Sequence, residues 1–110
     1  MTGPLVVVGD SLLDVDLEGR AGRLAPDAPV PVLDDVVERA RPGGAALAAT
    51  MAAAEGYDVV LVTSVGDDAA GARLRSLLEP VTLRLIDTDG PTPVKQRVRA
   101  GGQSLSLIHI

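Results

Sequence analysis

Two short apolar runs, one on each side of an alanine-rich segment, constrain the fold of this chain more than any other feature. Leu5–Val8 reads LVVV and Asp58–Val65 reads DVVLVTSV. Such runs are typical of strands buried on both faces of a parallel sheet. Between them, Ala45–Glu55 has the highest helix propensity in the sequence, and Gly56 is suited to follow its last turn. The order strand, helix, strand predicts a parallel sheet with right-handed crossover connections.

The same alternation continues toward the C-terminus. After the second strand, Asp67 or Asp68 is expected to cap a helix over Ala69–Leu78, which Pro80 ends. Val81–Ile86 then alternates loosely and predicts a third strand. Two adjacent aspartates could suggest a metal ion, but two ligands from one turn do not make a site. We therefore interpret this turn as a helix cap and predict no metal site.

Other segments indicate a second, smaller sheet. Leu12–Leu17 mostly alternates apolar and acidic residues, as in a half-exposed strand. Pro93–Ala100 predicts a strand with one cationic face, and the proline inside Val30–Leu33 limits that segment to an edge strand. Asp34–Arg39 is ambiguous, because its valines favour a strand while its charges favour an exposed position. Pro42–Gly44 predicts a break before the alanine-rich helix.

The composition excludes several classes of protein. The 110 residues fit one small domain, and with one aromatic residue, Tyr57, its core must be built from small aliphatic side chains. A net charge of −5 argues against a nucleic-acid partner, and the lack of cysteine excludes disulfides and thiolate metal sites. The sequence shows neither a secretory signal nor an apolar run of membrane-spanning length. We expect a soluble cytoplasmic protein with no membrane partner.

The last six residues differ in character from the rest. Leu105–Ile110 reads LSLIHI and contains the only histidine, His109. It is identical to the translation of a transposon-end sequence used in DNA library preparation. We therefore expect residues 105–110 to be a sequencing artefact, with the native frame cut near Ser104, and we assign no role to His109. The alternative is a genuine short strand.

Three groups of residues could bind a ligand. Asp10 and Asp14 follow the first strand, and open α/β sheets bind ligands at the carboxyl ends of their strands. Gly43-Gly44 opens a helix, where free backbone N–H groups suit a hydroxyl or a phosphate. Lys95 and Arg97, on the cationic strand face, could hold an anionic group. Each group also has a structural explanation: a turn, a tight connection to a helix, and a solvated strand face.

Five motifs in one order resemble the ribokinase-like carbohydrate kinases, the PfkB family. They are GDSLLD at Gly9–Asp14, RLAPDAPVPV at Arg23–Val32, RPGGAA at Arg41–Ala46, VGDDAAG at Val65–Gly71 and PTPVKQRV at Pro91–Val98. Within the family, the chain is most similar to the heptose-7-phosphate kinases of ADP-heptose synthesis. The resemblance implies an α/β fold with a ribokinase-like parallel sheet, flanking helices and a small β-lid, cut off after its N-terminal part at about residue 104.

The resemblance also implies roles for individual residues. Asp14 matches the carboxylate that binds sugar hydroxyls, and Gly43-Gly44 matches the diglycine of the sugar pocket. Lys95 and Arg97 match a basic pair that could contact a sugar phosphate. The lid strands of the family cover the sugar and often form a homodimer contact, so the intact parent is expected to be a homodimer. The parent would use ATP and Mg²⁺.

Two departures from the family pattern bear on which sugar is bound. Leu47 stands where the family usually has an asparagine that hydrogen-bonds the sugar, and Val15–Glu18 replaces the usual aromatic residues. The downstream Gly-x-Gly-Asp motif, which supplies the catalytic base, and the nucleotide pocket are not in these residues. We therefore expect the chain to bind neither ATP nor Mg²⁺ and to lack kinase activity.

Two alternatives stay open. The first is a non-catalytic sugar-binding or regulatory module that is naturally this short. The second is a Rossmann-like oxidoreductase domain, against which the missing Gly-x-Gly-x-x-Gly motif counts.

Overall fold

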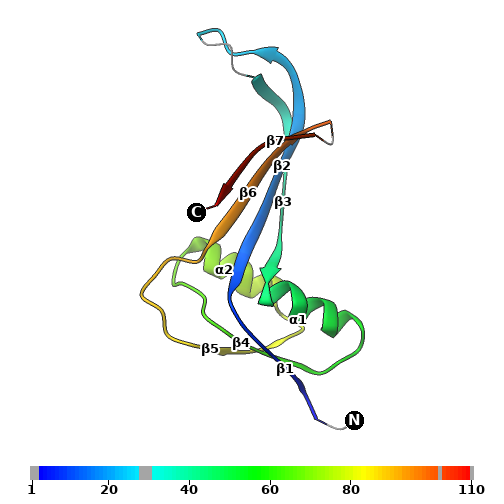
Figure 1. Ribbon diagram of the computed structural model, residues 1–110, viewed down its shortest axis with the longest axis vertical. Helices are drawn as coiled ribbons and strands as arrows, with labels where there is room; N and C mark the ends of the chain where they lie inside the picture. The colour runs from blue at the N-terminus through cyan, green and yellow to red at the C-terminus, as the bar shows by residue number, and fades with distance from the viewer. Residues whose placement is uncertain (1–2, 28–30, 102, 110) are drawn as a thin grey trace.

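The computed structural model describes residues 3–27, 31–101 and 103–109, which form two β-sheets and two helices (Figure 1). The molecule measures 59 × 32 × 17 Å along its principal axes. It is long because one sheet packs with the helices while the other extends away from them (Figure 1). The fold class is α/β, as the sequence predicts.

The first sheet is parallel and three-stranded, in the order β1-β4-β5. Its strands are β1 (Leu5–Val8), β4 (Val59–Thr63) and β5 (Thr82–Leu85). Helix α1 (Ala45–Ala54) precedes β4, and helix α2 (Ala69–Leu77) connects β4 to β5. All five elements predicted for this part of the chain are confirmed, each within two residues of its predicted ends.

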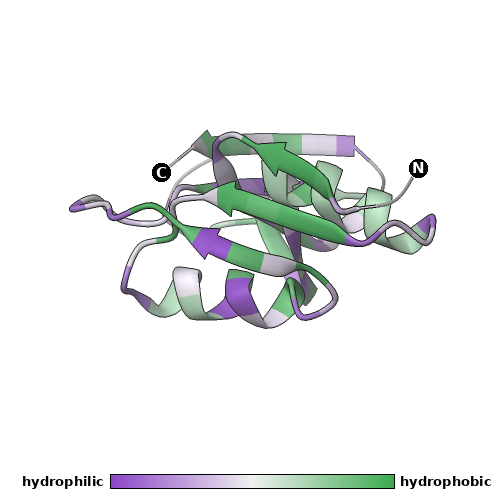
Figure 2. Ribbon diagram, turned by 90° about the horizontal axis from the view of Figure 1, so that it is seen from below, coloured by the Kyte–Doolittle hydropathy of each residue, from purple (hydrophilic) through white to green (hydrophobic). Residues whose placement is uncertain are grey.

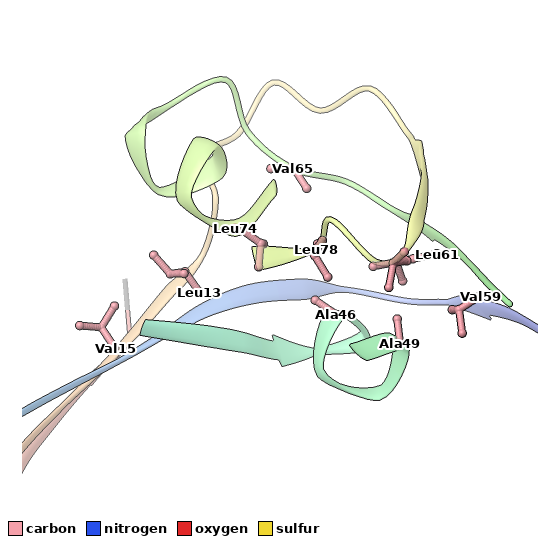
Figure 3. Close-up of a cluster of buried hydrophobic side chains, with 10 residues drawn as sticks. Leu13, Val15, Ala46, Ala49, Val59, Leu61, Val65, Leu74 and Leu78 are labelled. Carbon is pink, nitrogen blue, oxygen red and sulfur yellow. The ribbon is translucent and has the colours of Figure 1, made fainter. Parts of the chain in front are cut away.

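The hydrophobic core lies between this sheet and the two helices. Strand β4 is its centre, because Val59, Leu61 and Thr63 are each at most 1% exposed. Figure 3 shows Ala46 and Ala49 of α1 and Leu74 and Leu78 from α2 and its C-cap gathered around the same cluster. The buried apolar residues are Leu13, Val15, Ala46, Ala49, Val59, Leu61, Val65, Leu74, Leu78 and Val81.

Helix α1 is apolar on its outer face as well as its inner face. The buried Ala46 and Ala49 allow the helix to lie close to the sheet. Leu47 and Met51 on the other side are 41% and 61% exposed. The helix therefore packs closely on the sheet through one face only. The helix ends as predicted, since Gly56 adopts a φ of +98° directly after the C-cap Glu55.

Strand β1 forms where it was expected, but its predicted burial is wrong. Val6 and Val8 are 54% and 69% exposed, and Leu5 is 39% exposed. The strand lies at the edge of the sheet, with β4 on one side only. Within the described residues, the side of β1 that carries Val6 and Val8 is left uncovered. Figure 2 shows β1 and β4 green over most of their length, whereas β5 (TLRL) is interrupted by purple and pale segments.

The second sheet has four strands in the order β3-β2-β6-β7. They are β2 (Ser11–Leu24), β3 (Pro31–Gly44), β6 (Val94–Ala100) and β7 (Gln103–His109). β2 is antiparallel to β3 and parallel to β6, and β7 is antiparallel to β6. The sheet was predicted to be the smaller of the two and is in fact the larger, because β2 and β3 have 14 residues each.

Strand β3 corrects two expectations. The edge strand expected at Val30–Leu33 begins at Pro31 and continues through the ambiguous Asp34–Arg39; Val30 lies outside the described residues. Pro42–Gly44 does not interrupt the chain before the helix, because these residues are the last of β3 and α1 begins at Ala45. A proline is tolerated here since β3 is an edge strand that pairs on one side only.

The C-terminal residues pair with the second sheet. Strand β7 lies along β6, with Arg97 opposite Leu107 and Gln96 opposite Ile108. Leu105 and Leu107 stay exposed, so β7 adds backbone pairing and no core. Whether residues 105–110 are native stays a prediction, since six residues of alternating pattern can pair with an open strand edge whatever their origin.

Candidate functional site

Asp14 lies near the start of β2, and the alternating direction of the side chains along this strand determines which way it points. Its neighbours Leu13 and Val15 are 1% and 5% exposed and point into the core. Successive side chains of a strand point to opposite faces, so Asp14 points away from the core. The strand itself is anchored at its start, where Thr63 Oγ1 donates to the Gly9 carbonyl oxygen at 2.7 Å and lies 2.8 Å from Ser11 Oγ. The core therefore fixes the position of this carboxylate.

The backbone of Gly43 lies beside the carboxylate of Asp14. In the antiparallel pairing, Leu12 is opposite Gly43. A Cβ atom on Gly43 would lie 2.5 Å from Leu12 Cδ1 and 3.5 Å from Asp14 Oδ2. Only glycine fits there without displacing Leu12, and its small size leaves the backbone open next to the acid.

Gly44 and Asp10 meet through their backbones. The N–H of Ala45 donates to the Asp10 carbonyl oxygen at 2.8 Å, and a Cβ on Gly44 would lie 2.5 Å from that oxygen. Gly44 has a φ of +63° and is the N-cap of α1, with no side-chain cap. The Ala45 N–H is thus bonded to Asp10, while the amides that follow it in the first turn of α1 have no side-chain acceptor. The side chain of Asp10 is exposed.

Lys95 approaches Asp14 from the other neighbouring strand. The parallel register places Lys95 opposite Asp14, and Lys95 Nζ lies 3.9 Å from Asp14 Oδ2. Arg97 lies two residues further along β6, opposite Asp16. The structure thus brings together Asp14, Gly43 and Lys95, with Gly44 and Asp10 adjacent and Arg97 further from the core.

The side of the second sheet that carries Asp14 is charged over most of its length, and we call it the charged face. β2 contributes three acids to it: Asp14, Asp16 and Glu18. The strands on either side contribute five cations, Arg39 and Arg41 from β3 and Lys95, Arg97 and Arg99 from β6. On this face Lys95 pairs with Asp14, and Arg41 pairs with Asp16 at 3.4 Å.

A hydrogen-bonded cluster at Asp68 and Thr92 connects α2 to the start of β6. Asp68 caps α2 by accepting from the Gly71 N–H at 2.8 Å, which confirms one of the two caps predicted. Its carboxylate also accepts from the Thr92 N–H at 2.8 Å and from Thr92 Oγ1 at 2.7 Å. Thr92 Oγ1 in turn accepts from the Gly66 N–H at 2.9 Å. We call these contacts the Asp68–Thr92 clasp.

The clasp lowers the pKa of Asp68 below the ordinary value of an aspartate. The backbone hydrogen bond from Thr92 is the largest cause, followed by the Thr92 side chain and the Gly71 backbone. Each of these bonds stabilises the ionised carboxylate. Sequence reasoning missed Thr92, which is 4% exposed. A threonine between two prolines, in a segment otherwise poor in backbone donors, is the one signal that could have indicated it.

The clasp sets where β6 begins. Directly after Thr92, the Pro93 carbonyl oxygen accepts from the Leu13 N–H at 2.9 Å, and the pairing of β2 with β6 starts at the next residue. Lys95 is the third residue after Thr92. The position of Lys95 relative to Asp14 thus depends on the contacts of Thr92.

The described residues contain neither a cluster of metal-ligating side chains nor a membrane-spanning helix. No group of three or more histidine or acidic side chains gathers among them, so these residues do not fit a Mg²⁺ site. Neither helix in the described ranges is long and apolar enough to cross a membrane.

Comparison with known proteins shows related sequences. The chain is 58% identical over 98 residues to the bifunctional protein HldE of Streptomyces coelicolor, and 40% identical over 110 residues to that of Azorhizobium caulinodans. These matches cover 88% and 96% of this chain but only 21% and 23% of the relatives. No family model matches the sequence.

Solved structures show the same fold. The chain matches a carbohydrate kinase from Agrobacterium tumefaciens with a TM-score of 0.75 at 19% identity, covering 96% of this chain and 34% of that one. It matches Arabidopsis thaliana ribokinase, solved with ribose and ATP, with a TM-score of 0.72 at 26% identity, covering 100% and 36%. The fold is therefore ribokinase-like, over about a third of the length of these chains.

The chain combines a parallel sheet with flanking helices and a second sheet that extends from it. Together with the structural matches, this architecture defines the class: the chain has the fold of sugar kinases. Its curated relatives are HldE proteins, of which it covers 21% and 23%, and its fold is that of the ribokinase-like (PfkB) carbohydrate kinases. The prediction made from the five motifs is confirmed.

Proposed function

We propose that residues 1–104 are the N-terminal, sugar-binding part of an ATP-dependent carbohydrate kinase. The parent would transfer the γ-phosphate of ATP to a hydroxyl of a sugar or sugar phosphate, with D-glycero-D-manno-heptose 7-phosphate as the candidate acceptor. The observation that carries the proposal is the convergence of Asp14, Gly43 and Lys95, in a chain related to HldE proteins.

The chemistry of these residues suits a sugar. The Asp14 carboxylate accepts hydrogen bonds from hydroxyl groups, while Lys95 and the uncapped amides of α1 donate to oxygen atoms. Gly43 and Gly44 allow a ligand to approach the backbone closely. Asp10 and Arg97 flank this group on either side. Leu47, in the first turn of α1 and 41% exposed, offers a bound sugar an apolar contact and no amide.

The proposal divides the reaction between this chain and the rest of the parent. ATP and Mg²⁺ belong to the parent in this proposal, because the described residues do not fit a Mg²⁺ site. Phosphoryl transfer also needs a base and positioned phosphates. The chain by itself is expected to turn over no ATP in the presence of sugar. ATP hydrolysis above a protein-free control would contradict this expectation.

The sugar site is tested by titrating the ¹⁵N-labelled chain with D-glycero-D-manno-heptose 7-phosphate. We expect the amide signals of Asp14, Gly43, Gly44 and Lys95 to shift. Asp14→Asn should weaken binding about tenfold, since a hydrogen bond to a charged group contributes about 1.5–3 kcal/mol. Asp87→Asn, in the exposed loop after β5, is the matched control and should leave the affinity unchanged. Shifts confined to other residues, or none, would refute the site.

Resequencing the locus through codon 104 tests the parent. A frame that continues for roughly another two hundred residues and contains Gly-x-Gly-Asp, as an intact domain of this family would, supports the kinase. A true stop codon after Ile110 would instead make the chain a short sugar-binding module and remove the catalytic part of the proposal.

A further inference from the structure

The VGDDAAG segment, Val65–Gly71, contributes no residue to the proposed sugar site, but it surrounds the side chain of Thr92. Thr92 Oγ1 donates to Asp68 Oδ1 at 2.7 Å and accepts from the Gly66 N–H at 2.9 Å. The Thr92 N–H donates to Asp68 Oδ2 at 2.8 Å. Both donors of Thr92 and its hydroxyl oxygen are thus bonded within this one segment.

Two glycines of the segment leave the space that Thr92 occupies. A Cβ on Gly66 would lie 2.6 Å from the Thr92 nitrogen, and a Cβ on Gly71 would lie 2.8 Å from Thr92 Oγ1. No larger side chain fits at either position without displacing Thr92, since glycine alone permits such a close approach. The segment is therefore shaped around Thr92, with glycines that make room for it and an aspartate that accepts its protons.

Thr92 is the anchored residue of the connection between β5 and β6. Residues 87–93 are all exposed except Thr92, which is 4% exposed. The prolines on either side of it, Pro91 and Pro93, have no N–H to donate. The contacts of Thr92 therefore fix where β6 starts along β2.

The sequence of β6 leaves its register against β2 open to a slip of two residues. Basic side chains recur at every second position, Lys95, Arg97 and Arg99, with uncharged side chains between them. A slip of two residues keeps each side chain on its face of the sheet, but it would put Arg97 instead of Lys95 opposite Asp14. The alternating pattern excludes a slip of one residue and does not exclude a slip of two.

We propose that Thr92, held by Val65–Gly71, is a positioning residue that selects the register in which Lys95, and not Arg97, meets Asp14. The inference rests on the proposed function and deepens it, because Asp14 and Lys95 are side chains of the proposed sugar site. Thr92 itself acts only through Lys95 and does not contact the sugar.

The size of the slip shows why the contacts of Thr92 prevent it. Two residues correspond to about 7 Å along a strand, whereas the hydrogen bonds of Thr92 are 2.7 to 2.9 Å long. Thr92 would have to leave the segment before β6 could slip. The slipped strand would present a planar guanidinium to Asp14 in place of the ammonium of Lys95, with a different reach and different hydrogen-bonding directions.

The register is measured by nuclear Overhauser effects between backbone protons of β2 and β6 in the isotope-labelled chain. In wild type we expect contacts that pair Asp14 with Lys95. Thr92→Val keeps the shape of the side chain and removes the hydroxyl, so it should add a second set of contacts that pairs Asp14 with Arg97. Thr92→Ser should restore the wild-type set. Thr88→Val, at an exposed threonine of the same connection, is the matched control and should change nothing.

The effect on the site is measured by titrating the same variants with D-glycero-D-manno-heptose 7-phosphate. Lys95→Met should weaken binding about tenfold, and Thr92→Val should weaken it by a factor of similar size. In the Lys95→Met background, Thr92→Val should cause no further loss, because it acts through Lys95. Val59→Ala truncates a buried side chain near the start of β4, so it should destabilise the core and leave the affinity unchanged.

The outcomes separate this inference from the proposed function. A wild-type register in Thr92→Val, or an equal loss of affinity with and without Lys95, overturns the positioning role while the sugar site stands. A changed register in a chain whose wild type does not bind the sugar supports the role of Thr92 and overturns the proposed function. Asp68→Asn is the milder second variant, because its amide keeps one acceptor oxygen. It should change the register in the same direction, and an unchanged register there overturns the inference if Thr92→Val does not fold.

Discussion

The two sheets of this chain differ in what surrounds them. The three-stranded sheet has short strands of four or five residues, and two helices bury the centre of its middle strand. The four-stranded sheet has strands of up to 14 residues, and its buried side chains, such as Leu13 and Val15, lie at the start of β2. Beyond them the sheet is held by backbone pairing and by charges across its face. The first sheet should therefore govern stability, and the charged face of the second, which carries Asp14 and Lys95, should serve binding.

The largest expected effect comes from the centre of the first sheet. Leu61→Ala removes a side chain that is 0% exposed and leaves a cavity, so it should lower the free energy of unfolding by about 2–5 kcal/mol. Leu24→Ala, at the far end of β2 where the side chain is 60% exposed, should change it by less than about 0.5 kcal/mol. Urea denaturation of both variants measures the contrast. Equal losses would show that the second sheet shares the core.

The next effect lies at the junction of the two sheets. Thr92→Val keeps the shape of the side chain but removes the hydroxyl of the Asp68–Thr92 clasp, leaving the Gly66 N–H without its acceptor. The expected loss is about 1–3 kcal/mol of unfolding free energy. Thr92→Ser restores the hydroxyl and should recover most of it. Thr88→Val, at an exposed threonine that accepts from the Gly90 N–H at 3.2 Å, is the control.

Thr92→Val also tests whether the clasp positions β6. If it does, the amide signals of Val94 and Lys95 shift in this variant, and Thr92→Ser returns them to their wild-type positions. A loss of stability with β6 unmoved would limit the clasp to a role in capping α2.

The pH dependence of stability gives a third, smaller contrast. Hydrogen bonds from Thr92 and Gly71 lower the pKa of Asp68 in the folded state, so the native protein binds fewer protons there than the unfolded chain. The contribution of Asp68 is therefore complete above the unfolded-state pKa, near 4, and is lost as the pH falls through the lower folded-state pKa.

Asp68→Asn removes this ionisation. The difference in melting temperature between wild type and the variant should be largest near neutral pH and should shrink below about pH 4. Melting curves of both proteins between about pH 7 and pH 2.5 check this expectation. A difference that stays constant with pH would mean that the charge of Asp68 contributes nothing.

Local patterns predict most elements of the fold but not how they meet. The apolar run of β4 and the alanine-rich α1 can be recognised from the local sequence alone, and so can Asp68 as a helix cap. The burial of β1 is not predictable in the same way, because Val6 and Val8 are covered only if another element lies over them. The strand conformation of Pro42–Gly44 escapes prediction as well, since a proline and two glycines favour a turn unless the strand lies at an edge.

The candidate site shows the same division. Asp14, Gly43 and Lys95 can each be singled out in the sequence. Their meeting depends on the register of β2 with β3 and with β6, which no local pattern encodes. The clasp joins residues 24 positions apart and is likewise a product of the assembled fold. The resemblance to a family indicates which residues to expect at the site, and the register of the strands determines how these residues are arranged.

The smallest expected effect concerns an ion pair between helix α2, which packs on the first sheet, and strand β3 of the second sheet. Arg73 of α2 donates to Glu38 of β3 at 3.0 Å, but the two side chains remain 49% and 47% exposed. Water and salt screen such a pair, so Arg73→Gln should lower the unfolding free energy by less than about 1 kcal/mol, and added salt should diminish the difference. Denaturation at two salt concentrations measures it. A larger and salt-independent loss would mean that α2 and β3 are joined by more than this exposed pair, and that the division between a sheet that stabilises and a sheet that binds lies further out along β2.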